Sequence, residues 1–293
     1  MLTAVFGLSG ALIFGSADFL GGLAARRISA VRVTAISATT GLVVLLIATA
    51  FVGGTWSPGA ILWGVLSGVS GALAISLLYA SLAIGPMSIL SPLTAVLGAI
   101  VPMTWGIFSG DRFAPIGYAA LALALVAVVL VGFVPERGAV RASMRGLLLG
   151  SGSGIMIGGF MIFINQAPDD SGLIPLVMNR AVSASIMVAT VGILTWVRRV
   201  RRAGSSRPGE HAGPRWLPGL PLALAAGVVD SVANTLLLIG LRVGDLTVMS
   251  VLTAMYPAGT ILLAAIVLTE RIAPVQWVGL ALALTAAGML AIA

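Results

Sequence analysis

The sequence contains no cysteine and no lysine, and its one histidine, His211, stands in a polar stretch. Without cysteine, disulfides, thiol catalysis and thiolate metal sites are excluded. A lone histidine outside the apolar runs leaves no cluster of histidine ligands and no serine–histidine pair within them. Without lysine there is no phosphate-binding loop of the lysine type, so ATP is not expected to drive this protein. We therefore expect no metal and no cofactor.

Charged residues are also scarce. They make up 9% of the 293 residues, whereas 59% are apolar and the mean hydropathy is +1.13. One soluble core cannot enclose that much apolar surface, so the chain is expected to be an integral membrane protein. Its apolar runs are continuous rather than alternating, which predicts helices and not barrel strands. The net charge of +7 comes from arginines beside these runs, which indicates lipid headgroups and not nucleic acid as the partner.

Ten apolar runs are long enough to cross a hydrocarbon core of about 30 Å at a rise of about 1.5 Å per residue. The longest connection, Arg198 to Trp216, has no apolar period and is expected to be a solvated loop. We expect spans at Leu2–Ala25, Val33–Val52, Ala60–Ile84, Met87–Phe108, Pro115–Val134, Gly146–Gln166, Leu173–Val197, Leu217–Leu241, Leu246–Leu268 and Pro274–Ala293.

Two stretches of the sequence resemble one another. Residues 85–125 and 244–284 align without a gap at a constant offset of 159 residues. The matches include a charged turn, in which Asp111, Arg112 and Pro115 meet Glu270, Arg271 and Pro274. This agreement predicts an internal duplication, with a first repeat at 1–134, a linker at 135–145 and a second repeat at 146–293. The turn acids are expected to form local ion pairs and caps that hold the last two helices of each half.

The number of spans per repeat determines how the repeats relate. Five is odd, so the second copy lies upside down with respect to the first. The predicted fold is therefore an all-α integral membrane protein of ten transmembrane helices in two inverted five-helix repeats. The odd-numbered connections carry thirteen arginines and the even-numbered ones two. The positive-inside rule then predicts a multi-pass protein of the cytoplasmic membrane with both termini outside.

The run SVLTAMYPAGTILLAAIVLTERIAPVQWVGLALALTAAGM (Ser250 to Met289), its earlier echo and FGSADFLGGLAARR (Phe14 to Arg27) resemble the EamA-type branch of the drug/metabolite transporter superfamily. The resemblance covers essentially the whole chain, with Asp111 where the family usually has Glu. It implies ten helices in two inverted repeats around a central cavity. It also implies transport of small organic molecules, such as amino acids, nucleobase-like compounds or drugs, often as an exporter.

Three charged residues fall inside expected spans, where a charge is costly and marks a candidate functional site. Asp18 either faces a cavity, as a proton carrier or a contact for a cationic substrate, or has a structural role, in which it reaches back to Arg26 or Arg27 or accepts hydrogen bonds from neighbouring helices. Asp230 lies at the centre of its span with Asn234 one turn later on the same face. It can carry a proton, or pair with Arg180. Arg180, if free, would suit a substrate carboxylate; if paired, it would be scaffold.

Further candidates have weaker signals. Asn179 beside Arg180 and the aromatic residues Tyr79, Trp105 and Tyr256 are candidates for the wall of a cavity. An interfacial belt or helix packing explains each aromatic residue equally well. Three prolines inside spans are hinge candidates because each lacks a backbone N–H: Pro92, Pro102 and Pro257.

The leading hypothesis is a secondary transporter, an exporter by preference, in which a small organic metabolite reaches a midplane cavity by alternating access with proton coupling. A flippase for lipid-linked substrates is the alternative, because it shares the architecture but needs a groove open to the bilayer. A membrane-embedded enzyme is less favoured, since no span holds clustered acids or a histidine. The expected partners are the bilayer and a small-molecule substrate, and a monomer and a homodimer are both compatible with the sequence.

Overall fold

The regular structure of the described residues is helical throughout. The structure is a computed structural model that describes residues 2–82, 84, 87–132, 143–203, 219–269 and 272–292. In chain order its elements are α1 (Leu2–Ala25), α2 (Ala30–Val52), α3 (Pro58–Leu82), α4 (Met87–Ser109), α5 (Pro115–Gly132), α6 (Met144–Asn165), the short 3-10 turn η1 (Asp169–Ser171), α7 (Ile174–Ala203), α8 (Leu220–Val243), α9 (Leu246–Thr253), α10 (Tyr256–Val267) and α11 (Pro274–Ile292).

Most of these helices are suited to a bilayer. Eight helical segments of at least 18 residues are apolar enough to span a membrane, with α9 and α10 together forming one of them. Two shorter apolar helices cover residues 93–109 and 274–290. Each corresponds to an expected span, because the apolar runs fix both where a helix begins and how far it extends. The chain is thus an all-helical, multi-pass membrane protein.

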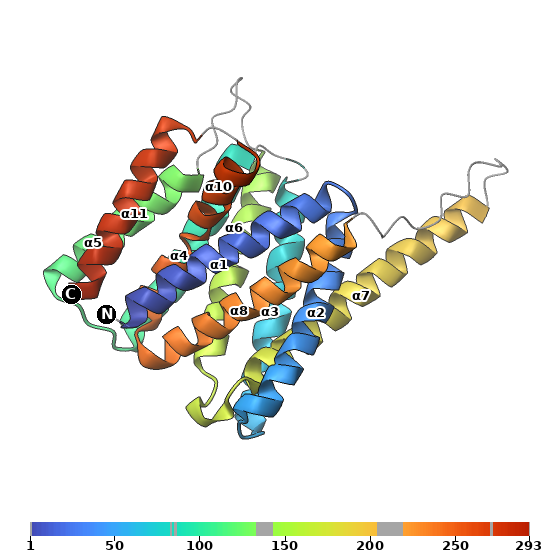
Figure 1. Cartoon of the computed structure of the whole chain (residues 1–293), viewed down its shortest axis with the longest axis horizontal. Coiled ribbons are helices and arrows are strands. Elements are labelled where there is room, and N and C mark those ends of the chain that lie inside the picture. Colours follow the sequence, from blue (N-terminus) through green and yellow to red (C-terminus); the bar gives the residue numbers. More distant parts are fainter. Residues whose placement is uncertain are drawn as a thin grey trace.

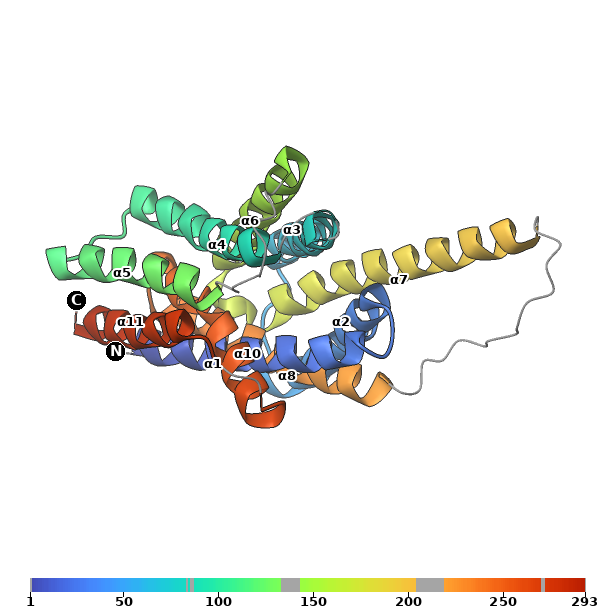
Figure 2. The same cartoon turned by 90° about the horizontal axis from the view of Figure 1, so that it is seen from above.

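The helices form two layers. Viewed from above, α3, α4, α5 and α6 lie in one layer, and α1, α2, α8, α10 and α11 lie in the other (Figure 2). Three contacts of the first five helices each have a counterpart in the later ones. The contact of α1 with α8 corresponds to that of α6 with α3, and the contact of α2 with α8 corresponds to that of α7 with α3. The contact of α1 with α9 and α10 corresponds to that of α6 with α4. The helices α5 and α11 pack directly on one another.

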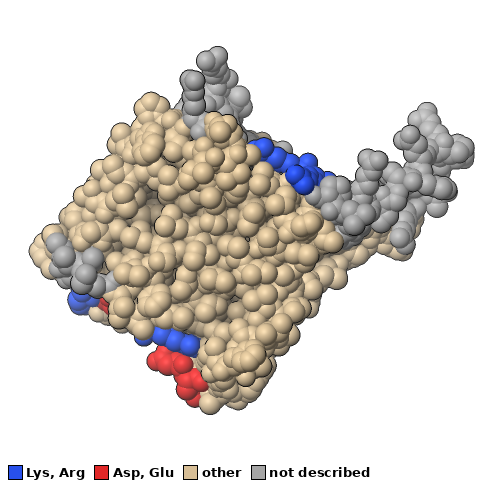
Figure 3. All heavy atoms as spheres, viewed as in Figure 1, with Lys and Arg blue, Asp and Glu red and all other residues tan. Residues whose placement is uncertain are grey.

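The bundle has two distinct ends. We call the end where α1 begins and α11 ends the terminus end (Figure 1). It also carries the connections 53–57, 110–114, 166–173 and 244–245. The opposite, or linker, end carries the connection between α1 and α2, the end of α7 and the start of α8. On the face shown in Figure 3, charged residues gather at two opposite margins and the surface between them has almost none. This is the distribution expected of a protein that crosses a bilayer.

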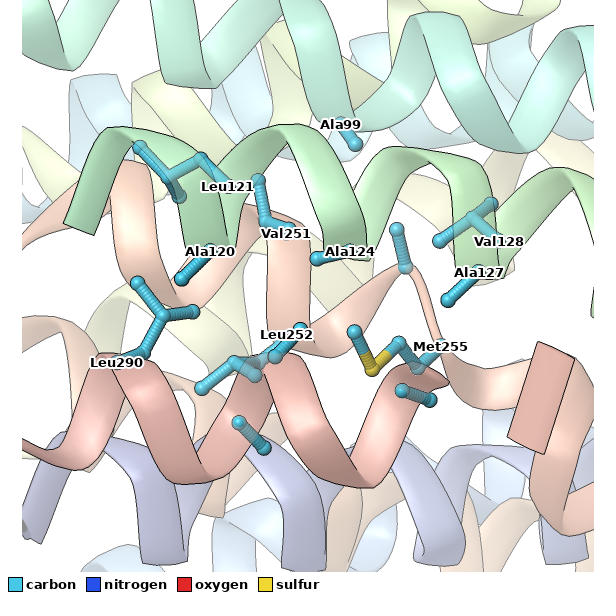
Figure 4. Packing of buried hydrophobic residues seen from close by; sticks show 14 of the residues in the cluster. Ala99, Ala120, Leu121, Ala124, Ala127, Val128, Val251, Leu252, Met255 and Leu290 are labelled. Atoms are coloured by element: carbon cyan, nitrogen blue, oxygen red, sulfur yellow. The ribbon is translucent and has the colours of Figure 1, made fainter. Parts of the chain in front are cut away.

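Small residues let the α5 and α11 helices approach closely. Ala120, Ala124 and Ala127 recur along one face of α5 and are completely buried. They contact a cluster that includes Val251, Leu252 and Met255 of the ninth span and Leu290 of α11 (Figure 4). In a bilayer the hydrophobic effect does not drive helices together, because lipid tails are as apolar as the helix surfaces. Close packing at faces of small residues is therefore a principal source of helix association.

The ninth expected span is interrupted. It was predicted as one helix from Leu246 to Leu268, but α9 ends at Thr253 and α10 begins at Tyr256. Pro257 explains the interruption, because it has no N–H to donate to the Thr253 carbonyl, four residues earlier. The amide of Met255 instead donates to the Leu252 carbonyl (3.1 Å) in a tighter turn.

The α7 helix is longer than its apolar run. The stretch after Val197 was predicted to be loop, yet the helix continues through the arginine-rich segment to Ala203. Arginine has a high helix propensity, and positive charge near a helix C-terminus is stabilised by the helix dipole. The remainder of the predicted loop, 204–218, lies outside the described residues.

Large apolar side chains close the bundle at the terminus end. This terminus-end cluster consists of buried residues from α2, α6, α7, α8 and α9. Its members are Leu45, Met161, Ile164, Leu173, Leu176, Val177, Leu237, Leu238, Leu241, Leu246 and Met249. Above it, the Arg242 guanidinium donates to the Gly172 carbonyl (2.8 Å) and the Ser171 hydroxyl (3.2 Å). The connection 166–173 is thereby held onto the end of α8.

Candidate functional site

Two of the three charges predicted inside spans form an ion pair. The Arg180 guanidinium on α7 donates to Oδ2 of Asp230 on α8. The side-chain amide of Asn234 donates to the same oxygen (3.2 Å) and to the Asp230 backbone carbonyl (2.8 Å). The Arg180 and Asp230 side chains are 15% and 26% exposed, so the pair is largely shielded from solvent. Of the two readings of Arg180 that the sequence left open, the structure therefore has the paired one.

A glycine on α2 makes room for this pair. A Cβ atom on Gly41 would lie 2.8 Å from the Ser231 hydroxyl and 3.5 Å from Cδ of Arg180. The Arg180 side chain therefore lies against bare backbone, and its Nε is buried without a hydrogen-bond partner in the described part of the chain. A larger residue at position 41 would push the guanidinium away from Asp230 or displace α8.

Asp18 lies on a stripe of α1 that changes character along the helix. Residues spaced by three or four lie on one helix face. The first four members of the stripe are buried, and the last three are exposed. In order, they are Ala4, Gly7, Ala11, Gly15, Asp18, Gly22 and Ala25. The helix face that packs into the bundle near the terminus end is thus exposed toward the linker end.

The surroundings of Asp18 show what this exposed face borders. Its side chain is exposed to solvent although protein atoms enclose the carboxylate. It is close enough to interact electrostatically with Asp230 and with the hydroxyl of Tyr256 on α10. One turn earlier, Phe14 packs against the terminus-end cluster. Asp18 is thus accessible at the surface of α1 while its charge interacts with groups on α8 and α10. We call the region bordered by Asp18, Asp230 and Tyr256 the recess.

Close contact between two helices places Tyr256 beside Asp18. At Gly15 of α1 and Gly259 of α10 the backbones touch, and a Cβ on Gly15 would lie 2.7 Å from Cα of Gly259. The Thr260 hydroxyl donates to the Gly15 carbonyl (3.0 Å) across the same crossing. The sequence analysis does not predict this contact, although small residues at matched positions of two helices are a signal for one.

The remaining predicted site residues are located elsewhere. Asn179 is buried and donates to the Ser67 hydroxyl (3.0 Å), so it ties α7 to α3. Trp105 is 46% exposed and lines a separate groove of about 310 Å³ with Trp63, Phe163 and Gln166. Pro102 is buried in an uninterrupted α4. The side chains of Tyr79 and Pro92 lie outside the described set, and the roles predicted for them stay predictions.

The turn acid Asp111 caps a helix of the other half. It was expected to form a local ion pair and cap within its own half. Instead its Oδ2 accepts from the Thr247 hydroxyl (2.6 Å) and the Thr247 amide (3.2 Å), in the first turn of α9. Among the described residues it forms no ion pair with Arg112. Its counterparts Glu270 and Arg271 lie outside the described residues.

Asp111 also affects a neighbouring acid at the start of α9. Partial burial raises the pKa of the Asp245 carboxyl, and the nearby Asp111 carboxylate raises it further. In the described ranges, no group of three or more His, Cys, Asp or Glu side chains could hold a metal ion. The chemistry available at the recess is therefore that of carboxylates, one paired guanidinium, an amide and a phenol.

The chain is similar to known proteins in sequence and in fold. The family model described as the EamA-like transporter family matches residues 144–292. A solved structure, described only as the crystal structure of a protein, superposes with a TM-score of 0.70 at 17% identity and covers 99% of this chain and 98% of its own. At that identity the likeness is one of fold. A comparison with curated proteins gave no match.

Proposed function

Because the chain belongs to the EamA-like transporter family, as its sequence predicted, we propose that it is a secondary active exporter of a small organic metabolite. It operates in the cytoplasmic membrane by alternating access, with both termini outside. The family is one of transporters, so we assign no enzymatic activity. The observation that carries the proposal is the accessible Asp18 inside a predicted span, close enough to interact electrostatically with Asp230 and Tyr256.

Alternating access requires two similar halves that can exchange conformations. The matched helix contacts support two inverted repeats, since exchanging α1 with α6, α2 with α7, α3 with α8 and α4 with α9 and α10 interchanges the members of each of the three pairs of corresponding contacts described above. Individual residues support the same relation. Ala124 and Ala127 of α5 are buried in one cluster with Ala283 and Ala286 of α11, which lie 159 residues later in the sequence.

The same mechanism requires that one end of the pathway be closed while the other is open. The terminus-end cluster fills the bundle on one side, and the exposed part of the Asp18 stripe opens toward the other. These two features support a conformation open toward the linker end. With the orientation proposed above, a substrate would enter the recess from the cytoplasm.

We propose proton coupling through the two carboxylates of the recess. Asp18 is accessible from the linker end, and Asp230 keeps one oxygen, Oδ1, outside its contacts with Arg180 and Asn234. A carboxylate within the membrane that exchanges a proton or a substrate between two exposures is the usual element of such coupling. Asp18 is the group that solvent reaches in the conformation described.

A flippase for lipid-linked substrates is less well supported. It would need a polar groove open to the bilayer, to accept a headgroup. The groove beside α6 is lined by Trp63, Trp105, Gly159, Ile162, Phe163 and Gln166. None of these residues is charged. The charged groups instead lie on the α1, α7 and α8 helices, at the recess.

The test is to express the protein in a strain without other exporters and to compare retained and released metabolites by mass spectrometry. At least one small metabolite should be released faster, and Asp18→Asn should reduce that release about tenfold or more. Asp245→Asn, the same change outside the spans, should leave it unchanged. A profile equal to that of cells without the protein overturns the transporter. Unchanged rates and pH dependence in both Asp18→Asn and Asp230→Asn overturn the proton coupling.

A further inference from the structure

The charges that surround the recess do not balance. Arg180 is matched by Asp230 through a direct ion pair, to which Asn234 adds a second donor. Asp18 has no hydrogen bond or ion pair with any described residue. The next cations along the chain, Arg26 and Arg27, come eight and nine residues later, just beyond the end of α1 and about 12 Å along its axis. With both carboxylates ionised, the described site carries one uncompensated negative charge.

An uncompensated charge inside a membrane protein is unfavourable, and a bound cation of opposite charge relieves it. We propose, on the basis of the transporter function above, that the substrate class of this recess is a small organic molecule with a single primary ammonium group. The ammonium binds between Asp18 and Asp230. Asp18 supplies the charge, and Oδ1 of Asp230 supplies a further acceptor.

The hydrogen-bonding capacity of the site matches that of a primary ammonium. Such a group has three N–H donors and no acceptor. Both contacts to Asp230 use its Oδ2, so its Oδ1 is available, and the Asp18 carboxylate is accessible to solvent. Inorganic divalent cations fit poorly, because within the described residues no three acids or histidines gather.

The same geometry disfavours carboxylate-bearing ligands. A substrate carboxylate would need the Arg180 guanidinium, which is already paired with Asp230. The other side of that guanidinium is closed, since its Nε is buried and lies against Gly41. An amino acid would therefore either leave its carboxylate unpaired beside Asp18 or break the buried ion pair. Both outcomes cost affinity.

Three ligands that share one aromatic body test this charge preference. They are phenethylamine, phenylalanine and 3-phenylpropionate, which carry a cationic, a zwitterionic and an anionic head at pH 7. Binding to the full-length protein in lipid nanodiscs would be measured by isothermal titration calorimetry. Phenethylamine should bind at least about tenfold more tightly than either of the other two.

Two acid-to-amide variants locate the effect. Asp18→Asn keeps the size of the side chain and should weaken phenethylamine binding about tenfold or more, removing the preference over phenylalanine. Asp245→Asn makes the same change in the connection before α9 and should leave all three affinities unchanged. Circular dichroism and the midpoint of thermal unfolding would show that each variant is folded.

The inference is overturned if phenethylamine fails to bind to folded protein, if phenylalanine or 3-phenylpropionate binds as tightly, or if Asp18→Asn leaves phenethylamine binding unchanged. The outcome is separable from that of the export assay. Metabolite release without ammonium binding would leave the transporter standing and remove the substrate class. Ammonium binding at Asp18 without release of any metabolite would leave the ligand class standing and remove the transporter.

Discussion

Asp18 and Asp230 are the same residue type inside neighbouring helices, yet their side chains have different surroundings. Asp230 has a guanidinium and an amide as partners, whereas Asp18 has solvent. The difference comes from residues on other helices. Arg180 reaches Asp230 because Gly41 leaves space for it, and the stripe of α1 that carries Asp18 is exposed beyond Gly15. Identical carboxylates are thereby suited to separate tasks, one to hold helices together and one to meet a ligand.

The ion pair gives a first prediction about stability. Asp230→Asn leaves the shielded Arg180 charge without its counter-ion and should lower the free energy of unfolding by about 3 kcal/mol. Arg180→Gln should have a comparable effect. The free energy of unfolding of the double variant should fall by about 1–3 kcal/mol less than the sum of the two single losses, because the double variant loses the ion pair only once. Thermal unfolding in detergent measures all three, and strictly additive losses would show that the two side chains do not interact.

A second prediction concerns the acid before α9. The folded-state pKa of Asp245 lies above its ordinary value of 3.8, so the folded protein holds a proton there that the unfolded chain has released. Stability from this group is present at low pH and is lost as the pH rises through the raised pKa. Asp245→Asn should therefore raise the midpoint of thermal unfolding when it is measured at pH 7. Below pH 3.8 the midpoint of the variant should equal that of the unmodified protein. The gain should be a few tenths of a kcal/mol, because the side chain is exposed.

The contradicting result for Asp245 is a variant whose unfolding midpoint differs from that of the unmodified protein by the same amount at every pH. Such a constant offset would indicate a change in the capping of α9, which is independent of charge, and not relief of the repulsion from Asp111.

At the scale of elements, the crossing of α1 and α10 determines the position of Tyr256. A Cβ on Gly15 would lie 2.6 Å from the Thr260 amide nitrogen, a backbone atom that cannot rotate aside. Gly15→Ala should therefore separate the helices and cost about 1–3 kcal/mol. Gly10→Ala on the same helix meets no atom within 4 Å and should be neutral or slightly stabilising. Thermal unfolding of the two variants compares them directly, and equal midpoints would exclude the close crossing.

The interruption of the ninth span leads to a prediction about activity. Pro257→Ala restores an N–H donor for the Thr253 carbonyl and lets α9 and α10 join into one helix. Stability should be unchanged or higher, while the export rate should fall several-fold if this joint moves during the cycle. Pro115→Ala, at the start of α5, is the matched control and should transport normally. A Pro257→Ala variant with full activity would remove the hinge role proposed for this proline.

At the scale of the whole molecule, most of the architecture followed from the apolar runs. The first expected span, Leu2–Ala25, coincides with α1, and the others differ by a few residues at each end, except where α7 and the ninth span depart. The length of an apolar run determines the length of a membrane helix, because each backbone N–H and C=O in the bilayer must form its hydrogen bond within its own segment. Features that depend on contacts with other segments could not be predicted from the apolar runs. Asp111 caps α9 across the halves, and the accessibility of Asp18 depends on what α1 fails to contact.

The orientation of the whole chain is open to a direct test, because the sequence has no cysteine of its own. Arg112→Cys lies in an exposed connection at the terminus end, and Thr269→Cys lies in one at the linker end. In intact cells, a membrane-impermeant maleimide should label the first and not the second. In inverted vesicles the pattern should reverse. Labelling of Thr269→Cys alone in intact cells would place both termini in the cytoplasm and overturn the arginine count.

The two parts of the ninth span are fastened to different neighbours. The α9 part is held by Asp111 at the end of α4, and the α10 part is held at Gly15 of α1. A change in the angle between α1 and α4 must therefore be taken up by the residues between the two fastenings. Between Met255, whose amide donates to Leu252 in a tighter turn, and Pro257, which has no N–H, the regular helical hydrogen bonds are already interrupted. This short joint can therefore bend with little further loss of hydrogen bonding while the helices on either side keep their shape.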